Sequence, residues 1–223
     1  MPRPFAGLRA QLLLLILLAA LPAFVIIFFL SDSFRESAGE QARAQTLQTA
    51  KQFAAQHQRH IDQTHQLLLA LAQIPAVQEA RGEACEKVLS DILRNSPPFL
   101  IALLAIQPDG NVLCNGATPG YRVQVADRAY FQNAMNDKRL AVGDYMVGRT
   151  TGLPSLGIAY PHVVEGKVEF LTFAALNLSW IGENFSADRV TEGATLTVID
   201  RQGTVLLRHP EGEAWLGKNV STH

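Results

Sequence analysis

Two short segments carry the side chains best suited to binding a small molecule. The first reads DRAYF at residues 127–131, and the second reads VGDYMVGR at residues 142–149. Their arginines offer fork-shaped donors and their tyrosines offer phenolic hydroxyls, a combination that suits a small anion. The candidate residues are Arg128, Tyr130, Asp144, Tyr145 and Arg149. The alternative is structural, with the tyrosines in the core and Arg128 paired with Asp144.

Histidines and cysteines give weaker signals. His57 and His60 lie one helical turn apart and His65 lies on another face, so they supply too few ligands for zinc. A cysteine nucleophile would need Cys114 beside His162, and the sequence contains no G-x-S-x-G, Walker or H-E-x-x-H motif. The formal net charge of −1 gives no electrostatic footprint for nucleic acid. We therefore expect no metal, no cofactor, no catalytic residue and no nucleic-acid partner.

Residues 11–30 form an uncharged segment that is apolar from Leu12 onward. As a helix it is long enough to cross the ~30 Å hydrocarbon core of a bilayer. Arg3 and Arg9 precede it and acidic residues follow it, so the positive-inside rule places residues 1–10 in the cytoplasm and the bulk of the chain in the periplasm. A cleaved signal peptide is the alternative, but the segment ends without an A-x-A site. The prediction is a single-pass anchor in the cell inner membrane.

A long helix is predicted to follow the anchor over residues 33–74, where the sequence contains no proline and only one glycine, Gly39. Its seam residues are spaced alternately three and four apart: Leu47, Ala50, Ala54, His57, Ile61, Thr64, Leu68 and Leu71. Such a heptad seam predicts a parallel homodimer. The alternative is that the helix packs on its own domain near Leu68 and Leu71. Pro75 should end the helix.

Beyond residue 99 the sequence changes to short apolar runs separated by turn residues. The predicted elements are a helix over 84–94, a helix over 127–136 capped by Asp127, and strands over 100–107, 111–115, 140–148, 154–164 and 167–178. Short connections such as Asp109-Gly110 favour antiparallel pairing. The predicted fold class is α/β (α+β), a PAS-like module with a five-stranded antiparallel sheet.

The chain also repeats a hairpin pattern. LLAIQPDGNVLCNG at 103–116 aligns with LTVIDRQGTVLLRH at 196–209, with an offset of 93 residues. The repeat predicts one module over 31–185, a linker over 186–193 and the start of a second, incomplete module over 194–223.

Several motifs occur together along the chain: Ala84-Cys85 with Cys114, DRAYFQNAM at 127–135, VGDYMVGRTTGLPSL at 142–156, AYPHV at 159–163 and the segment 194–220. In this order they resemble the double Cache sensor domains of bacterial transmembrane receptors. The resemblance covers the chain from about residue 31 onward. It implies an extracytoplasmic sensor whose membrane-distal module, 31–185, binds a small ligand and whose membrane-proximal module begins near Ala194.

The resemblance carries further expectations. Together with the predicted export, it implies a disulfide between Cys85 and Cys114. It implies ligand contacts for the five candidate residues of 127–131 and 142–149. Related receptors carry a cytoplasmic output, often a diguanylate cyclase or a histidine kinase, and this sequence contains neither motif set. The predicted function is therefore the sensory input of a signal-transduction receptor.

The ligand class follows from one departure from the family pattern. The branch that binds amino acids has a tryptophan in an RxWY string and an acidic residue two positions after a strand tyrosine. Here the string is Arg128-Ala129-Tyr130-Phe131, and Val147 stands two after Tyr145. An amino group would lack its acidic partner, so a carboxylate or another small anion is favoured. The alternative function is a membrane-anchored scaffold with a coiled coil and no small ligand.

Overall fold

The computed structural model describes residues 21, 43–44, 46–48, 50–55, 58–79, 82–184 and 193–221. The chain divides into two compact units, residues 1–52 and 53–223, and every described strand lies in the second. The predicted membrane span at 11–30 lies outside the described residues, except for Leu21. None of the helices within the described ranges is both long and apolar enough to cross a membrane. The predicted linker 186–193 is likewise outside them, except for Gly193.

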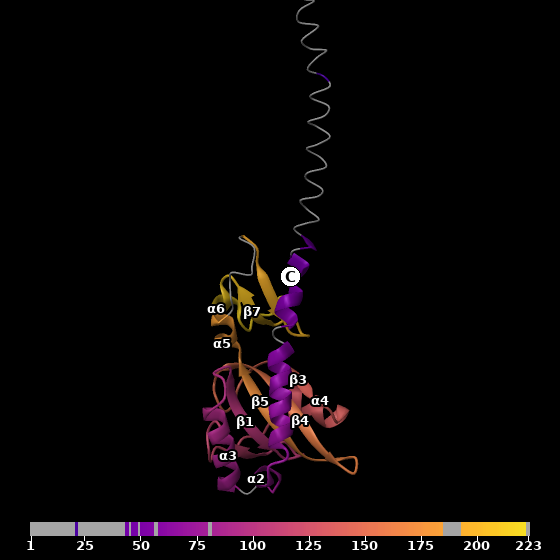
Figure 1. The fold of residues 1–223 in the computed structure, drawn as a ribbon, viewed down its shortest axis with the longest axis vertical. Helices are drawn as coiled ribbons and strands as arrows, with labels where there is room; N and C mark the ends of the chain where they lie inside the picture. Colours follow the sequence, from indigo (N-terminus) through magenta and orange to yellow (C-terminus); the bar gives the residue numbers. More distant parts are fainter. Residues whose placement is uncertain are drawn as a thin grey trace, which may run out of the picture. The chain divides into compact units, whose positions relative to one another are not determined.

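A five-stranded antiparallel sheet forms the centre of the second unit (Figure 1). Its strands are β1 (Leu100–Ile106), β2 (Val112–Asn115), β3 (Ala141–Val147), β4 (Pro154–Val164) and β5 (Lys167–Asn177). They lie in the order β2-β1-β5-β4-β3. Each strand end lies within one residue of its predicted position, because turn residues mark the ends of the apolar runs.

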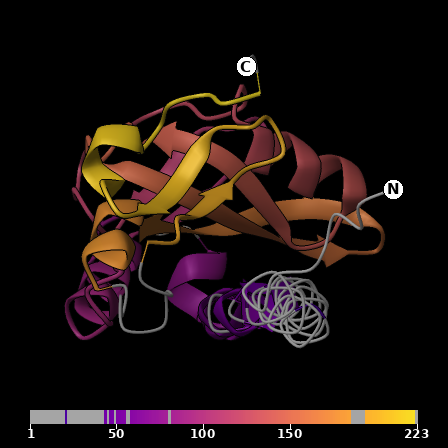
Figure 2. The same cartoon turned by 90° about the horizontal axis from the view of Figure 1, so that it is seen from above.

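Helices cover both faces of this sheet. The helix over 58–71, α2 (Pro75–Gln78) and α3 (Gly82–Arg94) pack on one face, where Leu68, Leu71 and Leu89 are fully buried. The helix α4 (Ala129–Asp137) packs on the other face through Tyr130, Phe131 and Ala134. Figure 2 shows the 58–71 helix and α4 on opposite sides of the sheet. The helix α5 (Leu178–Glu183) follows β5 directly.

The predicted heptad seam divides into two parts. Thr64, Leu68 and Leu71 are buried within the module, and the Thr172 hydroxyl donates a hydrogen bond to the Leu68 carbonyl at 3.1 Å. Leu47, near the start of the seam, is 57% exposed. The packing alternative is thus confirmed at Leu68 and Leu71, so these residues are not free for a dimer seam. His57 lies outside the described residues.

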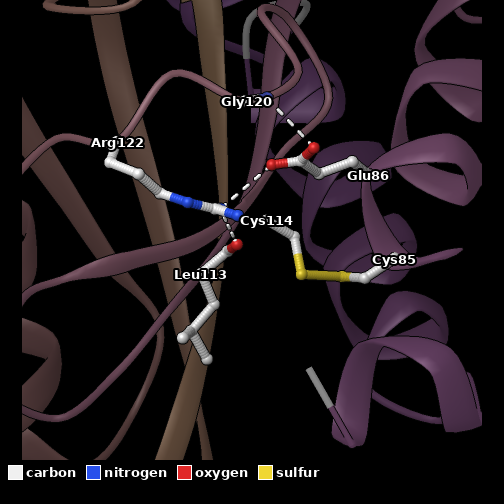
Figure 3. Close-up of a disulfide and its surroundings, with 6 residues drawn as sticks. All are labelled: Cys85, Glu86, Leu113, Cys114, Gly120 and Arg122. Atoms are coloured by element: carbon white, nitrogen blue, oxygen red, sulfur yellow. Dashed lines mark hydrogen bonds and ion pairs between the residues drawn. A yellow bond between two sulfur atoms is a disulfide. The ribbon is translucent and has the colours of Figure 1, made fainter. Parts of the chain in front are cut away.

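The disulfide between Cys85 and Cys114 is confirmed, with the two Cα atoms 5.8 Å apart (Figure 3). It joins α3 to β2, so Cys114 is not available as a thiol nucleophile. Beside it, the buried Glu86 carboxylate accepts hydrogen bonds from the Gly120 N–H and the Arg122 guanidinium, both at 3.0 Å. These contacts fix the loop after β2 against α3.

A second hairpin consists of β6 (Leu196–Ile199) and β7 (Val205–His209), followed by α6 (Gly212–Trp215). Its structure repeats that of β1 and β2. The register shift between Ala105 and Ile106 recurs between Val198 and Ile199, again 93 residues later. The return segments are equivalent too, since the Val125 N–H bonds the Gly110 carbonyl and the Val220 N–H bonds the Gly203 carbonyl. The two aligned sequence segments therefore adopt the same local structure.

Candidate functional site

A small pocket lies beside the start of α4 and the loop that follows β3. Its lining includes three of the five predicted residues, Arg128, Tyr130 and Arg149, together with Met146 and Phe173. Its volume is about 10 Å³, which is roughly the space of one water molecule. The pocket brings the two arginines together, as the two motifs had suggested.

Arg128 occupies the position that sequence analysis gave to Asp127. It is the N-cap residue of α4, and no side chain caps the helix. The prediction that Asp127 caps α4 is therefore wrong. The Arg128 guanidinium donates a hydrogen bond to the Val147 carbonyl at 3.3 Å, a long contact that a stronger acceptor can replace.

Asp127 instead forms a two-point ion pair with Arg149. Both nitrogen–oxygen distances are 2.7 Å, and the Arg149 Nη1 also donates to the Gln124 carbonyl at 2.7 Å. Hydrogen bonds from Arg149 lower the pKa of the Asp127 carboxyl to about 2. The structural alternative had the wrong partners, because the ion pair joins Arg149 to Asp127 and not Arg128 to Asp144.

Tyr130 combines a core position with an available hydroxyl. The residue is only 4% exposed, and its ring centroid lies 4.4 Å from that of Phe173. Burial raises the pKa of the Tyr130 phenol, so the group stays a neutral donor at all ordinary pH values. No hydrogen bond joins this hydroxyl to any residue that the structure describes.

The remaining two predicted residues, Asp144 and Tyr145, do not line the pocket. The Asp144 carboxylate accepts a hydrogen bond from the Gln202 side chain at 3.0 Å, and the Tyr145 N–H donates to the Asp200 carboxylate at 3.0 Å. Both therefore contact the second hairpin. A β-bulge in β3, which period-two alternation does not anticipate, changes the direction of these side chains.

The charges at the pocket leave a positive excess. Arg128 and Arg149 carry two positive charges, and Asp127 neutralises one of them. The rest of the lining is apolar or neutral, including Thr150 and Thr151 of the loop after β3. These two threonines were not predicted from the sequence, because nothing in the composition or spacing of the segment marks them. An arrangement of this kind can bind one anionic group and enclose an apolar part beside it.

A larger pocket, of about 190 Å³, lies between α5 and the second hairpin. Leu178, Leu207 and Leu216 line it, together with His209 and Glu213. None of the predicted ligand residues lies there.

A family model described as the Cache domain matches residues 30–222. No curated protein matches the chain.

Solved structures with the same fold come from bacterial receptors. The ligand-binding domain of the Pseudomonas fluorescens chemoreceptor CtaA in complex with L-serine aligns with a TM-score of 0.56 and 16% identity, covering 74% of this chain and 70% of that chain. The sensor domain of the V. cholerae histidine kinase DctB aligns with a TM-score of 0.59 and 15% identity, covering 81% and 69%. A domain of a Vibrio parahaemolyticus protein assigned to the sensory box/GGDEF family aligns with a TM-score of 0.54 and 15% identity, covering 74% and 69%. At these identities the likeness shows the fold alone.

Proposed function

We propose that this chain, which belongs to the Cache domain family, is the ligand-binding input region of a bacterial transmembrane signalling receptor. Its sensory module would lie in the periplasm behind an inner-membrane anchor at residues 11–30. The proposal assigns no catalytic role to the chain itself.

The observation that carries this proposal is the position of Arg128. Its guanidinium lines the pocket and has one long hydrogen bond, to the Val147 carbonyl at 3.3 Å. Replacing this neutral acceptor with a carboxylate is favourable for the guanidinium, because charge-assisted hydrogen bonds are shorter and stronger. Tyr130 supplies a second donor on the same wall.

The proposed ligand is a small carboxylate. Amino acids are bound in the CtaA structures with L-serine and with L-isoleucine, and those ligands are properties of CtaA. In this chain the net charge beside the pocket is positive, and the one carboxylate beside it among the described residues, that of Asp127, is already held by Arg149. An ammonium group would therefore find no free acidic partner.

Ligand entry requires the pocket to enlarge. Its present volume of about 10 Å³ is too small for a carboxylate. Arg149, whose side chain is 37% exposed, lies in the loop that lines one side of the pocket. In our proposal this loop moves outward to admit the ligand and closes again over it, so binding selects a form whose pocket is larger than the present one.

Thermal-shift screening of the purified chain against organic acids, amines and neutral solutes tests the ligand class. A ligand that binds the folded state raises the melting temperature by mass action. We expect small carboxylates to do so and amines not to. Stabilisation by amines alone would overturn the carboxylate proposal.

The architecture around the module completes the proposal. The hairpin β6–β7 would begin a membrane-proximal module, as its shared register with β1–β2 supports. An output domain outside this chain, a histidine kinase or a diguanylate cyclase, would receive the signal. Similarity to sensor domains from a histidine kinase and from a GGDEF-family protein supports these two classes.

A second candidate function is an anchored scaffold that binds no small molecule. The specific observation in its favour is the size of the pocket, which side chains almost fill. The same screen separates the two functions, since a scaffold would show no specific stabilisation by any solute class.

A further inference from the structure

Strand β3 makes contacts on two sides within five residues. On the pocket side, Met146 lines the cavity and the Val147 carbonyl accepts the hydrogen bond from Arg128. Gly143 lies against Tyr130, so closely that a Cβ atom built on Gly143 would be 3.0 Å from the Tyr130 Cβ. A displacement of Arg128 or Tyr130 would therefore change their contacts with β3 directly.

On its other side, β3 contacts the second hairpin. The Asp144 carboxylate accepts from the Gln202 side chain and the Tyr145 N–H donates to Asp200, each at 3.0 Å. The Tyr145 ring lies against Gly217, where an added Cβ would come within 2.6 Å of the ring. The contact thus combines a charged hydrogen bond with close packing that only glycine permits.

A β-bulge makes this double use possible. Val142 pairs with Ile158 and Tyr145 pairs with Leu156, so β3 advances three residues over a stretch where β4 advances two. The extra residue interrupts the ladder at this point, and the Tyr145 N–H bonds Asp200. Consecutive residues, Asp144 and Tyr145, consequently both reach the second hairpin.

Asp200 divides its two oxygens between the hairpin and the strand. Its Oδ1 accepts from the Gln202 N–H at 2.9 Å and from the Thr204 N–H at 2.8 Å, which closes the hairpin turn. Its Oδ2 accepts from the Tyr145 N–H. One carboxylate therefore fixes the turn and joins it to the bulge of β3.

We propose that this bulge couples the pocket to the second hairpin, so that ligand binding at Arg128 changes how firmly the hairpin is held at Asp144 and Tyr145. The inference rests on the proposed function and names the route by which that site would signal. When a ligand draws the Arg128 guanidinium from the Val147 carbonyl, the end of β3 loses a restraint two residues from Tyr145. Coupling of this kind is reciprocal. Weakening the contacts between β3 and the second hairpin must therefore also weaken the contacts that hold the pocket loop.

The variant Asp200→Asn separates the contact from the turn. An asparagine keeps one acceptor oxygen for the two turn N–H groups, but its amide then presents a donor to the Tyr145 N–H. The matched control is Arg201→Ala, in the same turn. Hydrogen exchange of the full chain, without ligand, is measured for both variants and for the parent protein.

Asp200→Asn should raise the exchange rate of the Tyr145 amide about tenfold or more, as expected when a hydrogen bond to a charged acceptor is lost. The proposal further requires a several-fold rise for Gly148 and Gly152, whose amides bond within the pocket loop. Arg201→Ala should change neither. The reciprocal variant, Arg128→Ala, should raise exchange at Tyr145 as well.

A rise confined to Tyr145 and the hairpin turn would overturn the coupling. If Asp200→Asn raised exchange throughout the sheet, the second variant Gln202→Ala would be used, because it removes the side-chain hydrogen bond to Asp144 and leaves the turn intact. The coupling then predicts faster exchange of the Gly148 and Gly152 amides in this variant. Because no ligand is used, the outcome is independent of the thermal-shift screen. A protein that binds no carboxylate but shows the coupled exchange would contradict the proposed function and leave the coupling intact.

Discussion

Asp127 and Arg149 form an ion pair with two hydrogen bonds of 2.7 Å each, and this pair joins the start of α4 to the loop after β3. The two residues are 22 positions apart in the sequence. Both side chains are partly exposed, so the pair contributes orientation more than stability. It holds the Arg149 guanidinium at the edge of the pocket, where the proposed ligand would enter.

The first prediction concerns the pH range of this pair. The folded pKa of Asp127, about 2, lies below the ordinary value of 3.8, so the stabilising contribution is present at neutral pH. It should disappear as pH falls from about 4 through about 2, because the carboxylate then takes up its proton. An NMR titration of the Asp127 carboxyl carbon measures the pKa. Arg149→Gln should return it to the ordinary value, and an unshifted pKa in the parent protein would contradict the pairing.

The disulfide provides a second prediction. Cys85 and Cys114 are 29 residues apart, and the chain-entropy model gives about 3–4 kcal/mol for closing a loop of that length. The double variant Cys85→Ala, Cys114→Ala should therefore unfold at lower urea concentration, with the free energy of unfolding reduced by that amount. A loss below about 1 kcal/mol would show that another effect offsets the entropy that the disulfide removes from the unfolded chain.

Glu86 should contribute more to stability than its neighbour on the same helix. Its side chain is 9% exposed and accepts from Gly120 and Arg122, whereas Lys87 is 74% exposed and forms an exposed ion pair with Asp91. Glu86→Ala leaves a partly buried N–H without its acceptor, so we expect a cost of about 1–3 kcal/mol in urea unfolding. Lys87→Ala, the control, should stay within about 0.5 kcal/mol. Equal effects would contradict the role given to Glu86.

The dimer prediction is now restricted to the first part of the seam. Leu68 and Leu71 are buried in their own module, while Leu47 is 57% exposed. If a parallel coiled coil forms, Leu47→Glu should shift the purified chain from dimer to monomer in analytical ultracentrifugation. Gln48→Glu adds the same charge beside the seam and should leave the dimer intact. A parent protein that sediments as a monomer at high concentration would remove the dimer from the proposal.

Most of the fold could be predicted from local sequence. Alternating apolar runs and glycine turns mark all five strands, and the aligned hairpin segments reveal β6 and β7. The position of Asp127 was misjudged because an aspartate before a helix is a strong capping signal, and nothing local shows that Arg149 competes for it. Asp144 and Tyr145 were assigned to the site because the bulge that redirects them depends on pairing with β4.

The pocket itself could be predicted only in part. Arg128, Tyr130 and Arg149 belong to recognisable motifs, and the structure brings them together. The apolar wall from β1 and β5, including Leu104 and Phe173, depends on strand order, which no local pattern fixes. The volume of the cavity depends on how side chains fill it, and that is a property of packing.

The most direct test of the central claim is carboxylate binding by Arg128→Ala, with Arg139→Ala as the control. Both substitutions remove one arginine, and Arg139 is exposed and forms an ion pair with Asp137. For an organic acid that stabilises the parent protein, Arg128→Ala should weaken binding by about 2–5 kcal/mol in calorimetry, as for loss of one partner of a buried charge pair. The melting temperature of the ligand-free protein should stay nearly unchanged, and Arg139→Ala should bind normally. Unchanged affinity in Arg128→Ala, or unfolding of its ligand-free form, would show that Arg128 is structural and contradict the account.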